Sequence, residues 1–209
     1  MCKLAIAAIA VLLTAPAFAA PVAGTDYQPV NPPQPTSDPS KIVVTEFFSY
    51  QCPHCFRFAK PYEDWIAKLP ADVKAERVAV SIGHQTWLPA AQAFYALTAM
   101  KKVPAIDDAL FGAIHRQRLQ LDTEAALTDW VGRQGIDQAA FTQAYQSFSV
   151  KLNMKRADDL SRSYRLPSVP TLAIDGRYLI PIADDGNFND QLEIANALIE
   201  QARRNRSTR

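Results

Sequence analysis

The chain has 209 residues, of which 48% are hydrophobic and 21% are charged, so it is long enough and apolar enough to fold around a core of its own. Its 22 basic and 21 acidic residues nearly balance. A chain without an excess of positive charge lacks the field that attracts nucleic acid or an anionic membrane surface, so neither class of partner is expected.

The first segment, residues 1–20, has the features of a secretory signal peptide. Lys3 precedes an apolar stretch, and the small residues Ala19 and Ala20 suit cleavage after either one. The apolar stretch is too short to span a bilayer of about 30 Å as a helix. Cys2 leaves with this leader, so the mature chain keeps two cysteines.

The residues after the leader predict an extended segment, a strand, a helix and a second strand. The extended segment is rich in proline, which allows at most a short edge strand. Residues 41–50 are a dense run of β-branched and aromatic residues, typical of a buried strand. Apolar side chains then recur at helical spacing from Phe58 to Leu69, which predicts a helix bent at Pro61. Residues 73–82 predict the second strand.

The second half of the chain predicts a long helical block, a hairpin and a last helix. Residues 88–165 have a helical pattern throughout. The pattern is broken at three places: Val103-Pro104, Gln120 to Thr123 and Gly135-Ile136. Residues 168–182 predict a hairpin with its turn at Asp175-Gly176, and residues 189–204 predict a closing amphipathic helix.

This order of elements predicts an α/β domain with a helical insertion. A single βαβ crossover needs only about 30 residues, so the helical block is far longer than the connection requires. We expect the α/β domain to comprise residues 21–83 and 166–209, and the insertion to comprise residues 84–165.

Cys52 and Cys55 form a Cys-x-x-Cys at the start of the first predicted helix. Pro53 takes the first helical position, where its missing N–H has no helical partner to lose. Cys52 then lies over the free N–H groups and the positive end of the helix dipole, which stabilise a thiolate. His54 adds a donor or a positive charge beside it. Cys55, one turn further in, is expected to be more buried.

Three other uses of the cysteine pair fit less well. A disulfide that closes a four-residue loop stabilises a chain by about 2 kcal/mol or less, which makes it a poor staple. A c-type haem site needs His after the second Cys, where Phe56 stands. A structural zinc site needs four ligands, and the chain adds only the scattered His54, His84 and His115. A redox pair is therefore favoured, and His115 is expected to be a helix-surface or partly buried residue.

The sequence EFFSYQCPHC, the helical block and SVPT before the later strand together resemble the DsbA family, the periplasmic thiol:disulfide oxidoreductases of the thioredoxin superfamily. The resemblance covers essentially the whole mature chain. It implies a thioredoxin-like fold whose helical subdomain is inserted between the second strand of the βαβ unit and a hairpin that starts at a cis-proline.

The resemblance also implies an activity and its partners. The enzyme would donate a Cys52–Cys55 disulfide to exported proteins during oxidative folding in the periplasm. It would act as a monomer without a cofactor or a metal ion, and a DsbB-like membrane protein would reoxidise it. Within the motif, Cys52 matches the nucleophilic cysteine, Cys55 the buried cysteine, and Pro53 and His54 the dipeptide that tunes the pair.

The start of the hairpin matches the substrate-binding loop of the family. Val169, Pro170 and Thr171 stand at this position, and Pro170 falls on the proline that the family holds in cis. A cis bond would turn the Val169 backbone toward the sulfurs and let it pair with an extended substrate segment, as in strand addition.

Glu46 is an anomaly, because a carboxylate stands inside a strand that should be apolar on both faces. The family places an acidic residue beneath the buried cysteine at this position. A desolvated Glu46 with a raised pKa could move protons for Cys55. The alternative is an outward-facing Glu46 on an edge strand.

Two other functions stay open. One is a disulfide isomerase or reductant on the same fold, which a separate dimerisation domain would favour; the roughly 20 residues after the leader are too few for one. The other is a metal-binding chaperone that uses Cys52, Cys55 and His54. No Met-rich segment or second Cys/His cluster supports it.

Overall fold

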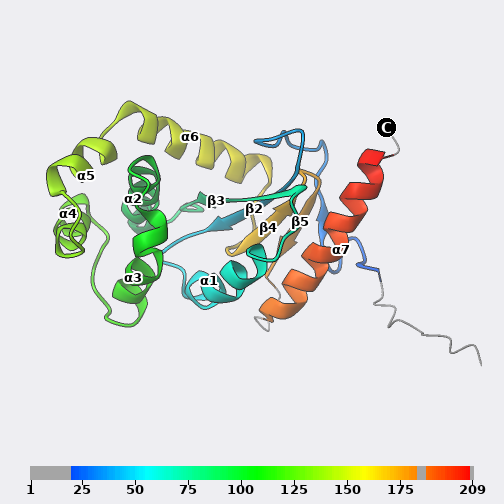
Figure 1. Cartoon of the computed structure of the whole chain (residues 1–209), viewed down its shortest axis with the longest axis horizontal. Coiled ribbons are helices and arrows are strands. Elements are labelled where there is room, and N and C mark those ends of the chain that lie inside the picture. Colours follow the sequence, from blue (N-terminus) through cyan, green and yellow to red (C-terminus); the bar gives the residue numbers. More distant parts are fainter. Residues whose placement is uncertain (1–19, 183–186, 208–209) are drawn as a thin grey trace, which may run out of the picture.

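Five strands form a single mixed sheet at the centre of the molecule (Figure 1). The computed structural model describes residues 20–182 and 187–207, so the predicted signal peptide lies outside the described residues except for Ala20. The strand order is β1-β5-β4-β2-β3. The strands are β1 (Gln28–Pro29), β2 (Ile42–Phe48), β3 (Val73–Ala79), β4 (Thr171–Ile174) and β5 (Tyr178–Pro181).

The strand that leads to the cysteines, β2, occupies an interior position in the sheet. It runs parallel to β3 and antiparallel to β4, and all of its residues are buried. Its β-branched and aromatic side chains suit a strand that is covered on both faces. The strands predicted for residues 41–50 and 73–82 are confirmed, although each ends a few residues earlier than predicted.

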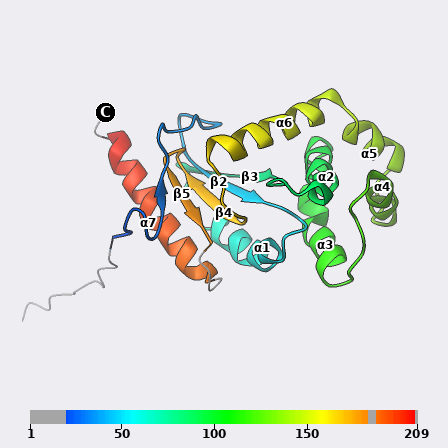
Figure 2. The ribbon, with the colours of Figure 1, turned by 180° about the vertical axis from the view of Figure 1, so that it is seen from behind.

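Two helices, α1 (Pro53–Ile66) and α7 (Phe188–Ser207), cover one face of the sheet (Figures 1 and 2). Phe58 and Tyr62 of α1 pack there with apolar side chains of α7 and of the strands. Pro61 lies inside α1. None of the described helices is long and apolar enough to cross a membrane.

The helical block lies between β3 and β4 in the sequence and forms a lobe beside one end of the sheet (Figure 1). It consists of a short 3-10 turn and five helices: η1 (Gln85–Trp87), α2 (Leu88–Ala99), α3 (Val103–His115), α4 (Glu124–Arg133), α5 (Gln138–Tyr145) and α6 (Phe148–Ser163). The three predicted breaks are present. A further break falls at Ser147, whose hydroxyl accepts a hydrogen bond from the Val150 N–H and caps α6.

The last helix of the block, α6, returns from the lobe to the face of the sheet opposite α1 and α7 (Figure 2). Directly after α6, the ring of Tyr164 packs against the ring of Phe47 on β2, with the ring centres 5.1 Å apart. The lobe and this face of the sheet therefore share one apolar core.

The β4–β5 hairpin turns at Asp175 and Gly176, as predicted. Both residues have positive φ, 53° and 68°, which is the requirement of the tight turns that suit a hairpin. A Cβ on Gly176 would lie 2.0 Å from the backbone oxygen of Gln34, so the close approach of the lead-in segment also requires glycine. This segment adds β1 to the sheet edge beside β5, which confirms the predicted short edge strand.

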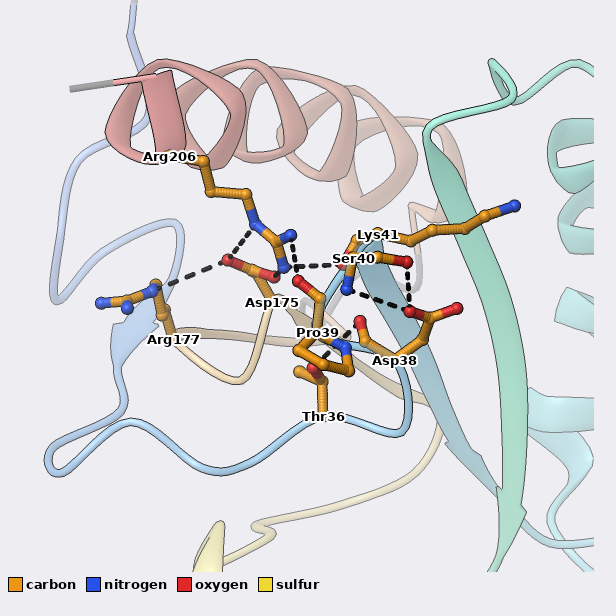
Figure 3. A network of polar contacts seen from close by, with 8 residues as sticks. All are labelled: Thr36, Asp38, Pro39, Ser40, Lys41, Asp175, Arg177 and Arg206. Carbon is orange, nitrogen blue, oxygen red and sulfur yellow. Dashed lines mark hydrogen bonds and ion pairs between the residues drawn. The ribbon is translucent and has the colours of Figure 1, made fainter. Parts of the chain in front are cut away.

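Arg206, in the last turn of α7, joins three parts of the chain that are distant in sequence (Figure 3). Its guanidinium forms an ion pair with the buried carboxylate of Asp175 in the hairpin turn. It also donates to the backbone oxygens of Pro39, at 2.9 Å, and Lys41, at 2.6 Å. The end of α7, the hairpin and the entry to β2 are thus held together by one side chain.

Candidate active site at the start of α1

Cys52 precedes the first turn of α1, with Pro53 at the beginning of the helix. The backbone of Cys52 is extended, with φ −85° and ψ 120°, and its N–H donates to the Ser49 oxygen at 3.1 Å. Cys52 as a whole is only 5% exposed. The residue therefore occupies the position predicted for it, where the strand's exit loop meets the helix.

The two cysteines lie in opposite electrostatic environments. A hydrogen bond from the Cys55 thiol is the largest cause that lowers the pKa of Cys52, from 9.0 to about 7. The backbone N–H groups of Cys55 and His54 and the charge of Arg57 lower it further, and burial opposes them. Burial raises the pKa of Cys55 well above its ordinary value. Both cysteines are unbonded, so this geometry belongs to the dithiol form.

The backbone N–H of His54 interacts with the Cys52 sulfur, whereas the His54 ring contacts Arg57. Its Nδ1 lies 3.0 Å from the Nη2 atom of Arg57, one turn along α1. Because a guanidinium can only donate, Nδ1 accepts this hydrogen bond. The ring therefore holds in place a positive charge that lowers the pKa of the Cys52 thiol.

Val169 and Pro170 lie beside Cys52, although more than a hundred residues separate them in the sequence. The Sγ atom of Cys52 lies 3.3 Å from the Val169 carbonyl oxygen, to which the thiol donates. The Val169-Pro170 peptide bond is cis, as the resemblance implies. Thr171 is fully buried, and its hydroxyl donates to the Ser168 oxygen at 2.9 Å, within the same loop.

Glu46 is completely buried in β2, between β3 and β4, so the alternative of an outward-facing residue on an edge strand is wrong. Its Oε2 atom accepts a hydrogen bond from Arg77 Nε at 2.6 Å, whereas Oε1 has no hydrogen-bond partner among the described residues. Burial raises the pKa of Glu46, and the charge of Arg77 opposes this effect. The Glu46 charge in turn helps to raise the pKa of Cys55.

Arg77 and Asp107 complete a part-buried polar cluster that was not predicted from the sequence. Arg77 donates to Asp107 Oδ2 at 2.9 Å, and its guanidinium lies 3.8 Å from the centre of the Phe48 ring. Arg77 pairs in register with Glu46, and each is the fifth residue of its strand. The sequence carried a weaker signal, because it predicted a neighbouring strand that contains Arg77 but not the register that pairs Arg77 with Glu46. Nothing in the sequence brings Asp107, on α3, to this point.

His115, the last residue of α3, lies closer to the cysteines than expected. It is half-buried, as predicted, but its Nε2 atom lies 2.8 Å from the backbone oxygen of Tyr50, two residues before Cys52. Its ring stacks on the Phe56 ring with centres 5.0 Å apart. Burial lowers the pKa of His115. His115 thus supports the loop that carries the first cysteine.

Known proteins resemble this chain over most of its length. Residues 43–193 match the family described as the DSBA-like thioredoxin domain. The thiol:disulfide interchange protein DsbA of Pseudomonas aeruginosa is 35% identical over 181 residues, which are 87% of this chain and 85% of the relative. The protein of the same name from Bordetella parapertussis is 36% identical over 201 residues, which are 96% of this chain and 95% of the relative. This chain belongs to the DsbA family.

Solved structures of the DsbA family share the fold. The crystal structure of Pseudomonas aeruginosa DsbA matches with a TM-score of 0.85 and 34% identity, over 89% of this chain and 96% of that one. The oxidoreductase DsbA from Xylella fastidiosa matches with a TM-score of 0.81 and 27% identity, over 88% and 98%. The fold is thioredoxin-like, with a helical subdomain between β3 and the β4–β5 hairpin, and the protein is a thiol:disulfide oxidoreductase. The predicted fold class and enzyme class are confirmed.

Proposed function

We propose that the protein oxidises paired thiols in exported proteins by donating a disulfide between Cys52 and Cys55. The observation that carries this proposal is the contrast between the two sulfurs: the pKa of Cys52 is lowered to about 7, while the pKa of buried Cys55 is raised. A stabilised thiolate favours the reduced form and makes the disulfide a stronger oxidant. Each pKa unit corresponds to about 1.4 kcal/mol, or about 30 mV for a two-electron couple.

In the proposed reaction, two client thiols become one disulfide. A client thiolate attacks the Cys52 sulfur, the Cys52–Cys55 bond breaks, and its electron pair passes to the Cys55 sulfur, which takes a proton. A second client thiolate then attacks the client sulfur of the mixed disulfide, and Cys52 leaves as a thiolate. Its low pKa makes Cys52 a good leaving group in this step. Glu46 is the buried carboxyl group that supplies the proton to Cys55.

The client would bind along the loop that faces the cysteines. Val169, Pro170 and Thr171 follow one another where β4 begins, and the Val169 carbonyl lies beside the attacked sulfur. An extended client segment can pair with this backbone as an added strand, which brings its own cysteine to Cys52.

We also propose the cellular setting and the division of the chain. The segment 1–20 would export the protein to the periplasm, with cleavage after Ala19 or Ala20. There it would act as a monomer on newly exported proteins, and a DsbB-like membrane protein would restore its disulfide. The α/β domain would comprise residues 21–83 and 166–209 around the insertion of residues 84–165. No cofactor, metal ion or nucleic acid is required.

Replacing each cysteine in turn tests the assigned roles. We expect Cys52→Ser to abolish oxidation of a reduced dithiol peptide, because the attacked sulfur is lost. Mixing Cys55→Ser protein with a single-cysteine peptide under oxidising conditions should accumulate a covalent complex, because neither Cys55 nor a second client thiol is present to break the mixed disulfide. Mass spectrometry of the quenched mixture, with wild-type protein as the control, detects the complex.

Turnover by Cys55→Ser at the wild-type rate would contradict these roles. An isomerase or reductant, the main alternative from the sequence, would instead rearrange or reduce a client disulfide faster than it oxidises a client dithiol.

A further inference from the structure

Glu46 shares its cation with a second carboxylate, which comes from the inserted helices. Arg77 Nε donates to Glu46 Oε2 at 2.6 Å, and Arg77 Nη1 donates to Asp107 Oδ2 at 2.9 Å. The other oxygen of Asp107 accepts a hydrogen bond from the Tyr50 hydroxyl at 2.5 Å. One guanidinium thus faces two carboxyl groups, and only one of the two negative charges can be balanced.

Glu46 is the more deeply buried of the two carboxyl groups. The side chain of Asp107 is 23% exposed, whereas that of Glu46 is not exposed at all and leaves Oε1 without a hydrogen bond. An unbalanced charge costs most where water is absent. Desolvation is the main cause that raises the pKa of Glu46, and the charge of Asp107 raises it further.

We propose that Asp107 is a positioning residue for the oxidation: by holding part of the Arg77 guanidinium, it keeps the Glu46 carboxyl in the protonated form that can give its proton to Cys55. This inference rests on the proposed function and adds to it a residue of the inserted subdomain. When the Cys52–Cys55 bond breaks, the Cys55 thiolate takes the Glu46 proton. The new Glu46 carboxylate is then stabilised by Arg77, and solvent returns the proton later.

The other titratable groups around Glu46 keep their charge over the pH range in which Glu46 titrates. The groups that interact with it come from four parts of the fold: Arg77 of β3, Asp107 of α3, Cys55 and Tyr62 of α1, and Tyr50 of the loop before α1. Burial raises the pKa values of both tyrosines and of Cys55 well above their ordinary values, so these three groups stay neutral. Arg77 and Asp107 therefore supply the charges that act on Glu46.

Asp107→Asn and the matched variant Asp108→Asn test the proposal. Asp108 is the next residue of α3, but its side chain is 85% exposed and pairs with Arg116 at 3.1 Å. The titration of the Glu46 carboxyl carbon is followed by 13C NMR in reduced protein labelled at glutamate. We expect Asp107→Asn to lower the pH midpoint of Glu46 by about one unit, because Arg77 is then free to stabilise the Glu46 carboxylate. Asp108→Asn should keep the wild-type midpoint, and Asp107→Glu, which retains the charge, should stay near it.

The pH profile of client oxidation in a single turnover gives a second readout. Relative to wild type, Asp107→Asn should lose rate as pH rises from its lowered Glu46 midpoint to the wild-type midpoint and then keep a constant lower ratio, whereas Asp108→Asn should give a constant ratio throughout. In a Glu46→Gln background, Asp107→Asn should change the profile no further, because there is no carboxyl left to tune. A simple loss of stability would not produce this dependence on Glu46.

Equal Glu46 midpoints in Asp107→Asn, Asp108→Asn and wild type would overturn the inference. A wild-type Glu46 that titrates at or below its ordinary value of 4.5 would also overturn it, and this measurement needs no variant. Failure of the wild-type protein to oxidise the client peptide would instead contradict the proposed function, so the two failures are distinguishable.

Discussion

At the scale of single residues, the chemistry depends on two cysteines that are three positions apart and experience different surroundings. Cys52 lies at the open N-terminus of α1, where two backbone N–H groups and the Cys55 thiol act on its sulfur. Cys55 lies inside the core, where no water stabilises a thiolate. The hydrogen bond from Cys55, the N–H groups at the helix start and the burial of Cys55 therefore separate the pKa values of the two cysteines.

His54 acts on Cys52 in part through Arg57, so replacing its ring should weaken the thiolate. We expect His54→Leu to raise the pKa of Cys52 by up to about one unit, because the substitution removes the ring nitrogen that holds the guanidinium near the sulfur. Thiolate absorbance in a pH titration of the reduced protein measures the change. Lys60→Leu, which removes an exposed positive charge of the same helix, is the control and should titrate like wild type. A His54→Leu titration that overlays the wild-type curve would assign the effect to the helix terminus and Cys55.

The site residues that are near one another in the sequence could be predicted from it. The site residues that are distant in sequence could be predicted only in part. The spacing of Cys52 and Cys55 and the proline between them were sufficient to place Cys52 directly before α1 and Cys55 in its first turn. The placement of Pro170 next to them came from the family resemblance, because no local pattern connects two segments so far apart. Asp107 and His115 contribute through tertiary packing of α3, and each has an unremarkable helical sequence around it.

At the scale of elements, local signals predicted most of the architecture. The β-branched run of β2 and the Asp175-Gly176 turn each have a local physical cause, and both elements formed where expected. The break at Ser147 was missed because the helical periodicity continues on both sides of it, so only the capping residue marks the end. The contacts of Arg206 also could not be predicted from a local pattern, since its partners lie in the hairpin and in the segment that leads into β2.

Arg206 should contribute more to stability than a neighbouring arginine with an exposed partner. Its carboxylate partner Asp175 is only 7% exposed, whereas Arg203, one turn earlier, pairs with the exposed Asp72. We expect Arg206→Gln to lower the free energy of unfolding by about 1.5 to 3 kcal/mol, because a buried charge loses its hydrogen bonds. Arg203→Gln should cost less than about 1 kcal/mol. Urea unfolding of both variants makes the comparison, and equal losses would show that burial of the partner is not the deciding factor.

At the scale of the whole molecule, the redox state and the stability of the fold are linked through the cysteine pKa values. Cys52 ionises near pH 7 in the folded protein and near pH 9 when unperturbed, so the thiolate stabilises the reduced fold fully above pH 9. This contribution is lost as pH falls through 7. The contribution of Cys55 to the stability of the reduced fold has the opposite sign. Above pH 9 the Cys55 thiol ionises in the unfolded chain but not in the folded core, which lowers the stability of the fold. The oxidised protein has neither thiol and so lacks both effects.

The stability of the reduced form relative to the oxidised form should therefore rise between pH 7 and pH 9. The shift of Cys52 predicts an increase of about 2 kcal/mol over this interval, and a decrease above it because Cys55 then costs the reduced form stability. Urea unfolding of both redox forms at pH 7, 8 and 9 measures the difference. A difference that does not change with pH would show that Cys52 is not a stabilised thiolate in the folded protein.

The reduction potential of the Cys52–Cys55 couple, measured at equilibrium against glutathione at pH 7, tests the proposed oxidase function most directly. A protein that donates its disulfide must be more oxidising than the glutathione couple it is compared with, so we predict a value less negative than about −220 mV. A value more negative than this would mean that the reduced form is the donor of electrons to client disulfides. It would contradict an oxidase and favour a reductant on the same fold.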